Sequence, residues 1–191
     1  MQAEVPSRVR AFLAESGGHI DLGELRAGNS VELSGPVLSL RDASAARLAA
    51  AVERGDQLPI SLAGRIMYAV GPSPAPPGRI IGSAGPTTTA RMARFLPALF
   101  SAGVIGVIGK GELHDDDMAA FTQHGAVYFA AIGGLGALLS KHIAAASVVA
   151  YDDLGAEGLY ALELERFPAV VIIDRAGRNF HEESRTRWRR P

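Results

Sequence analysis

The 191-residue sequence contains no cysteine. This excludes disulfide bonds, a thiolate nucleophile, and any zinc or iron–sulfur site whose cysteine ligands come from this chain. The five histidines do not pair at helical spacing, and His19 and His181 stand far from the others in the sequence. We therefore predict no metal site built from this chain alone.

The sequence also lacks a strong charge of one sign and a long apolar run. A formal net charge of −1 gives no general attraction for nucleic acid or an anionic membrane. No run reaches the roughly 18 apolar residues that span a bilayer, and the N-terminus lacks the pattern of a signal peptide. We expect a soluble, cytoplasmic protein, with a frayed, solvated basic tail over residues 181–191.

Lysine is scarce: only Lys110 and Lys141 occur among the 19 basic residues. Lys110 follows the apolar run of residues 104–108, at the position where a strand would end. A compact ammonium binds different ligands from a planar guanidinium. A lysine at this position in an arginine-rich chain therefore indicates a functional need for the ammonium. A salt bridge to a nearby Asp or Glu explains it equally well.

Short apolar runs alternate with helical patterns along most of the chain. We predict strands at residues 31–35, 65–70, 104–108, 126–131, 147–151 and 169–174. We predict helices at residues 42–53, 88–102, 115–124 and 134–142, and a helical turn within 9–14. The alternation indicates an α/β fold with a mostly parallel sheet and covering helices. We expect a β-rich N-terminal part to pack on this sheet. Residues 1–18 would form an N-terminal segment, and residues 19–180 would form one domain.

The run Gly85-Pro86-Thr87-Thr88-Thr89-Ala90-Arg91-Met92 is the most informative motif. Pro suits the first turn of a helix, and the amino end of a helix favours anions. On such a helix Thr87 and Arg91 would share a face, so a hydroxyl and a guanidinium would converge on a small carboxylate. The alternative is a threonine-capped helix with a solvated arginine.

Three basic residues lie at or near predicted strand–helix junctions. Arg41 follows Val37-Leu38-Ser39-Leu40, Arg91 lies in the first turns of the next helix, and Lys110 follows residues 104–108. Ligands of open α/β sheets gather at the carboxyl ends of strands, and in a parallel sheet Lys110 and the start of the Thr87 helix are both placed for such a site. The glycine-rich segments 103–111 and 130–136 lack nucleotide-binding spacing, and we interpret the second as close helix–strand packing.

These motifs together are recognisable. The matching stretches, in order, are Arg26-Ala27-Gly28, Val31 to Gly35, Arg41-Asp42, Tyr68 with Gly71-Pro72, Gly85 to Met92, Gly109-Lys110-Gly111, Gly125 to Phe129, Tyr151 to Gly155, and Phe167-Pro168-Ala169. The sequence resembles the β subunit, or C-terminal domain, of class I fumarate hydratases and L(+)-tartrate dehydratases. The resemblance covers residues 20–175.

The resemblance implies a swivelling β/β/α fold and a hydro-lyase. In that family a partner α subunit holds a [4Fe–4S] cluster with three cysteines and leaves one iron open for a hydroxy acid. By position, Thr87 is similar to the catalytic threonine and Arg91 to a substrate carboxylate ligand. Arg41 and Lys110 are similar to further dicarboxylate contacts. The absence of cysteine agrees with this division between subunits.

The residue types fit hydration of a fumarate-type double bond. Negative charge builds on a carboxylate during that reaction, and cationic side chains stabilise it. A Lewis-acidic iron activates the hydroxyl or water oxygen. Cations near Thr87 would favour its alkoxide and make it a better base.

One position departs from the family pattern. Members commonly carry His four residues after the Arg of the Arg-Asp motif, where this chain has Ala45. The leading hypothesis is a β subunit acting on fumarate/malate or L-tartrate. A stand-alone dicarboxylate-binding or regulatory module, or a structural assembly subunit, are the alternatives.

Overall fold

The computed structural model describes residues 9–12 and 22–189. Its strands are β1 (Val9–Phe12), β2 (Ser30–Leu40), β3 (Ile66–Ala69), β4 (Gly106–Gly109), β5 (Val127–Ala130), β6 (Ile143–Ala150) and β7 (Leu159–Ile173). Its α-helices are α1 (Asp42–Arg54), α2 (Leu96–Ser101), α3 (Asp115–His124), α4 (Gly136–Leu139) and α5 (Phe180–Trp188). Short 3-10 segments are η1 (Leu22–Glu24), η2 (Thr89–Arg91), η3 (Ala93–Phe95), η4 (Ser140–His142) and η5 (Asp152–Glu157).

The strands form one seven-stranded sheet in the order β1-β2-β3-β4-β5-β7-β6. Neighbours from β1 to β5 are parallel, whereas β7 is antiparallel to β5, β6 and β2. Because β2 pairs with both β3 and β7, and β5 also pairs with β7, the strands β2, β3, β4, β5 and β7 close into a ring. A mixed α/β fold is therefore confirmed.

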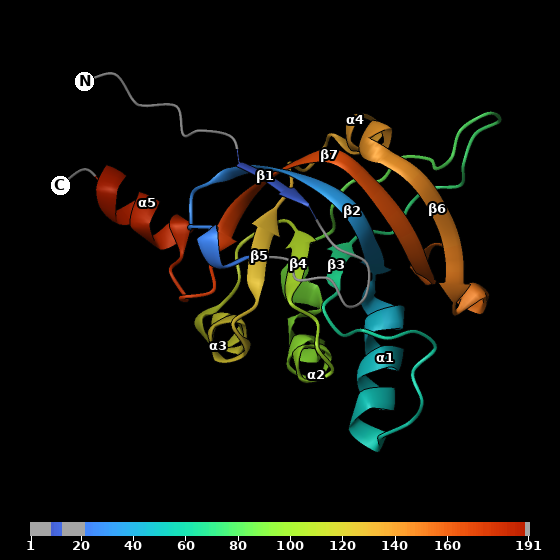
Figure 1. Cartoon of the computed structure of the whole chain (residues 1–191), viewed down its shortest axis with the longest axis horizontal. Coiled ribbons are helices and arrows are strands. Elements are labelled where there is room, and N and C mark those ends of the chain that lie inside the picture. Colours follow the sequence, from blue (N-terminus) through green and yellow to red (C-terminus); the bar gives the residue numbers. More distant parts are fainter. Residues whose placement is uncertain (1–8, 13–21, 190–191) are drawn as a thin grey trace.

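The elements lie in three layers (Figure 1). Strands β2, β7 and β6 arch over one face of the short parallel strands, and α1, α2 and α3 cover the opposite face. Neighbouring residues alternate between two buried clusters: Tyr68 and Phe129 face the arch, whereas Met67 and Tyr128 face the helices. Strands buried on both faces need apolar side chains throughout, which explains the continuous runs in the sequence.

The expected division into a β-rich N-terminal part and an α/β C-terminal part is wrong. The N-terminal strand β2 pairs along its length with the C-terminal strand β7, from Ser30 opposite Val170 to Leu38 opposite Ala161. Strand β3, also from the first half, belongs to the parallel layer. Both halves of the chain therefore build the same sheet and share the same core.

The predicted helix over 88–102 is also wrong in its first part. Residues up to Phe95 form two 3-10 turns, and α2 begins only at Leu96, with Pro97 in its first turn. The predicted helix over 134–142 is a single turn, α4, followed by η4. Residues 9–12 form the strand β1 instead of a helical turn, and residues 13 and 14 lie outside the described part.

The basic tail differs from the expected frayed terminus, because residues 180–188 form α5. Asn179 caps this helix by accepting a hydrogen bond from the His181 N–H at 2.9 Å, and Phe180 packs beside Gly28. Within the described residues, no helix is long and apolar enough to cross a membrane.

Candidate functional site

The candidate site lies at the carboxyl edge of the parallel strands. Arg41 follows the end of β2 directly, and Lys110 follows the end of β4. The backbone keeps these ends level, because the Val70 N–H donates to Leu40 and the Ala131 N–H donates to Gly109. As expected for a parallel sheet, the residues just beyond these strands share one edge.

Thr87 lies between the ends of β3 and β4. Its N–H donates to the Ala69 carbonyl at 2.7 Å, and its own carbonyl accepts from the Lys110 N–H at 3.2 Å. Pro86 and Thr88 form isolated bridges to Val70 and Lys110 on either side. Since its backbone groups are used across strands, Thr87 starts no helix, and the predicted helix face shared with Arg91 is absent.

The Lys110 side chain runs over Gly133, where an added Cβ would lie 3.3 Å from Lys110 Cδ and 3.6 Å from Nζ. The nearby carboxylate of Glu112 pairs with Arg185 at 3.3 Å. No carboxylate among the described residues forms a salt bridge with Lys110, so the salt-bridge explanation for this lysine is wrong there. The ammonium remains available to an anion.

A buried network supports the segment of Thr87. The Thr89 hydroxyl donates to Tyr128 Oη at 3.1 Å, and that hydroxyl donates to the Gly111 carbonyl at 2.9 Å. Burial raises the pKa of Tyr128 to about 12, although the bond with Thr89 lowers it in part. Gly109 is required beneath this network, because an added Cβ would lie 1.9 Å from Thr89 Oγ1.

Arg41 lies just before α1, and its side chain is 22% exposed. Its Nη2 donates to Glu157 Oε1 at 3.1 Å, and its Nε lies 3.6 Å from Asp42 Oδ2. The other Glu157 oxygen accepts from the Ala43 N–H at 2.9 Å, so this carboxylate also caps the first turn of α1. Sequence patterns did not predict this contact, because Glu157 follows Arg41 by 116 residues.

Arg91 reaches the same group of charges from η2. Its Nε donates to Asp42 Oδ1 at 3.2 Å, and its Nη2 lies 3.0 Å from Asp42 Oδ2. The Arg91 side chain is 55% exposed, so much of the guanidinium faces solvent. Asp42 thus lies between the two arginines, a role that its place in the Arg-Asp motif could have suggested.

This edge therefore combines three cationic side chains, one hydroxyl and two carboxylates. Arg41 and Arg91 are each paired with a carboxylate, whereas Lys110 has none among the described residues. The cationic side chains thus outnumber the carboxylates by one, and their remaining N–H donors suit an anion with more than one oxygen. The described residues contain no cluster of His, Asp or Glu suited to hold a metal ion.

Ala45 occupies the position of the expected histidine. It is fully buried on α1, where its N–H donates to the Arg41 carbonyl at 2.7 Å. The methyl group packs in the core between the sheet and the helices. The chain thus brings no imidazole to Arg41 from this helix position.

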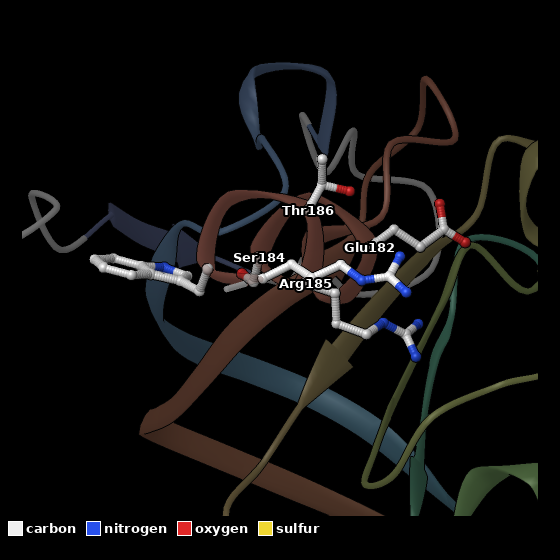
Figure 2. Close-up of a pocket in the computed structure, with 6 residues that line it drawn as sticks. Glu182, Ser184, Arg185 and Thr186 are labelled. Atoms are coloured by element: carbon white, nitrogen blue, oxygen red, sulfur yellow. The ribbon is translucent and has the colours of Figure 1, made fainter. Parts of the chain in front are cut away.

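A separate hollow lies along α5 (Figure 2). The described residues that line it are Glu182, Ser184, Arg185, Thr186, Trp188 and Arg189. None of the four candidate residues belongs to it. We therefore treat the carboxyl edge of the sheet, with Arg41, Thr87, Arg91 and Lys110, as the candidate site.

Comparison with known proteins identifies the family to which this α/β domain belongs. Residues 4–184 match the model of the family described as Fumarase C-terminus, and the chain belongs to that family. The chain is 32% identical to the aerobic class I fumarate hydratase of Salmonella typhimurium and 32% identical to the anaerobic class I enzyme of Escherichia coli. Each match covers 85% of this chain.

The share of each relative that is covered differs sharply. The chain spans only 28% and 30% of the length of those two fumarate hydratases. It is 30% identical to a putative L(+)-tartrate dehydratase subunit beta of Methanocaldococcus jannaschii, and that match covers 85% of this chain and 87% of the relative. The chain therefore corresponds to one part of the longer relatives and to nearly all of the shorter one.

Proposed function

We propose that the chain is the β subunit of a two-subunit iron–sulfur hydro-lyase that adds water to, or removes it from, a small dicarboxylate. Fumarate/malate and L-tartrate are the candidate substrates, because the relatives carry those names. The convergence of Arg41, Thr87, Arg91 and Lys110 at one edge of the sheet is the observation that carries this proposal. The three-layer arrangement supports the swivelling β/β/α type of fold.

In this proposal the arginines and Lys110 bind the substrate carboxylates. Their charges stabilise the negative charge that builds on a carboxylate as the proton next to it is removed. The Thr87 hydroxyl moves that proton, and the neighbouring cations favour its alkoxide form.

A cysteine-free chain does not fit a [4Fe–4S] cluster of its own, so we assign the cluster to a partner α subunit. When bound there, the cluster supplies a Lewis-acidic iron for the oxygen that is added or lost. This chain would supply the dicarboxylate-binding half of the shared site.

Anaerobic co-purification with a candidate α subunit, followed by fumarate hydration and tartrate dehydration assays, tests the proposal. The pair should turn over one of these substrates, whereas the chain alone should be colourless and inactive after reconstitution with iron and sulfide. A stoichiometric cluster on the isolated chain would overturn the subunit assignment. Dicarboxylate binding without turnover in any pairing would favour the stand-alone binding module instead.

A further inference from the structure

We infer that Glu157 is a positioning residue for Arg41: its carboxylate fixes the guanidinium in the orientation that receives a substrate carboxylate. This inference rests on the proposed function, in which Arg41 contacts substrate. It adds a residue that is distant in the sequence, since Glu157 ends η5, two positions before β7 begins at Leu159.

Glu157 supplies the only hydrogen-bond acceptor that the Arg41 side chain has among the described residues. The bond joins Arg41 Nη2 to Glu157 Oε1 at 3.1 Å. Arg41 Nε is buried without a hydrogen-bond partner there, since Asp42 Oδ2 lies 3.6 Å away. A long side chain held by one strong contact loses its preferred orientation when that contact is removed.

The carboxylate of Glu157 is itself fixed. Its second oxygen accepts from the Ala43 N–H at 2.9 Å, so both oxygens are engaged. The segment that carries it is fastened to α1, because Arg47 donates two hydrogen bonds of 2.8 Å to Asp153 and lies 4.8 Å from the centre of the Tyr151 ring. A fixed acceptor orients its donor better than a mobile one does.

Gly71 also restricts the position of the Arg41 guanidinium. An added Cβ at Gly71 would lie 2.6 Å from Arg41 Nη1 and 3.1 Å from the Ala156 carbonyl. The guanidinium therefore fits closely against the bare backbone of residue 71, with the carboxylate of Glu157 at Nη2. Close packing, the hydrogen-bonded ion pair with Glu157 and the longer ion pair with Asp42 together define a single orientation.

A purely structural role for Glu157, as the cap of α1, makes a different prediction. Glu157→Gln keeps a side-chain oxygen for the Ala43 N–H but removes the negative charge beside Arg41. If only the cap mattered, this variant would leave both stability and substrate binding almost unchanged, because the acceptor for the Ala43 N–H persists. If orientation of Arg41 matters, substrate binding should weaken while the cap persists.

The main test uses the enzyme assembled with its α subunit. We expect Glu157→Gln to lower kcat/KM about tenfold, mostly through a higher KM, because a carboxylate contact acts in the substrate complex as well as in the transition state. The matched control is Glu163→Gln, an exposed glutamate on β7, which should leave both constants unchanged. Added to Arg41→Lys, the Glu157→Gln change should cause little further loss.

Gly71→Ala provides a second variant that removes no polar group. The added methyl group should displace the guanidinium and raise KM in the same way. A normal KM in both Glu157→Gln and Gly71→Ala, or fully additive losses with Arg41→Lys, would overturn the inference.

A measurement without turnover separates this inference from the proposed function. In the ¹⁵N-labelled 191-residue chain, the Arg41 side-chain signals should show restricted rotation of the guanidinium, and Glu157→Gln should release it. The Arg41→Lys spectrum identifies those signals. Identical Arg41 signals in the chain with and without Glu157→Gln would contradict the inference, whereas an inactive wild-type assembly would contradict only the proposed function.

Discussion

The two edges of the parallel sheet use charge in opposite ways. At the carboxyl edge, the Lys110 ammonium has no salt bridge to a described residue, and the Arg91 guanidinium is 55% exposed. At the amino edge, beside the start of β5, the Asp174 carboxyl is 1% exposed. It accepts hydrogen bonds from the N–H groups of Ala27, Ala176 and Arg178 and from the Arg178 side chain.

This difference separates a charge that stabilises the fold from charges that we propose to bind a ligand. A buried carboxylate is tolerated only when its hydrogen bonds are complete, as they are at Asp174. At the carboxyl edge, the exposed part of the Arg91 guanidinium keeps donors that water can satisfy, which costs little and leaves them free to bind an anion. Changes at the carboxyl edge should therefore affect turnover, and changes at Asp174 should affect stability.

The largest effect is expected from Thr87→Val in the assembled enzyme. Valine keeps the shape and the backbone bonds to Ala69 and Lys110 but removes the hydroxyl. If that hydroxyl transfers the proton, kcat should fall by about 10²–10⁴-fold. The unfolding midpoint should change little, because the Thr87 side chain caps no helix in the described part of the chain.

Thr122→Val is the matched control, since among the described residues the hydrogen bond of its hydroxyl goes to the Met118 carbonyl on α3, at 3.4 Å. It should retain the wild-type rate. A Thr87→Val enzyme with normal kcat would remove Thr87 from the chemistry.

A smaller effect is expected from Arg91→Lys. An ammonium cannot reproduce the two-point contact that the guanidinium makes with Asp42, nor a bidentate grip on a substrate carboxylate. Loss of such a contact costs about 1.5–3 kcal/mol, or roughly 10- to 150-fold in kcat/KM. Arg94→Lys is the control, because Arg94 stacks on Phe95 at 4.6 Å. Equal kinetics for the two variants would make Arg91 an ordinary surface residue.

At the amino edge of the sheet, the contribution of Asp174 to stability should depend on pH in the acid range. Burial alone would raise the pKa of this carboxyl, but the hydrogen bonds from Ala27 and Arg178 bring it below 3.8. Its contribution to stability is therefore complete above pH 3.8 and is lost as the pH falls through the lowered pKa.

Asp174→Asn should cost about 1.5–3 kcal/mol at neutral pH and flatten the acid limb of the stability curve. Denaturant unfolding between neutral and acid pH measures both effects. The variant should keep wild-type kcat in the assembled enzyme. An unchanged acid limb would show that other groups dominate acid unfolding.

Sequence patterns predicted the short central strands and the shared edge because both depend on local hydrophobicity and on parallel pairing, but they missed β1 and most of β7. The same patterns misplaced Thr87 on a helix, since its cross-strand bonds to Ala69 and Lys110 override helix propensity. They missed Glu157 because its contact with Arg41 depends on how β7 returns beside β2. The family resemblance identified the candidate residues, while side-chain partners required the three-dimensional arrangement.

The smallest expected effect concerns the support under Thr87. Gly109→Ala would bring a methyl group within 1.9 Å of Thr89 Oγ1, and overpacking of this kind costs about 1–3 kcal/mol. Thr89→Ala alone should also destabilise the chain, because it leaves the buried Tyr128 hydroxyl without one of its two partners. In the double variant the methyl group gains the space of the missing hydroxyl, so the loss should be smaller than the sum of the single losses by about 0.5–3 kcal/mol. Denaturant unfolding of the four chains measures this coupling. Additive losses would mean that the carboxyl edge adjusts to a methyl group by backbone movement, and that Gly109 does not fix the position of Thr89.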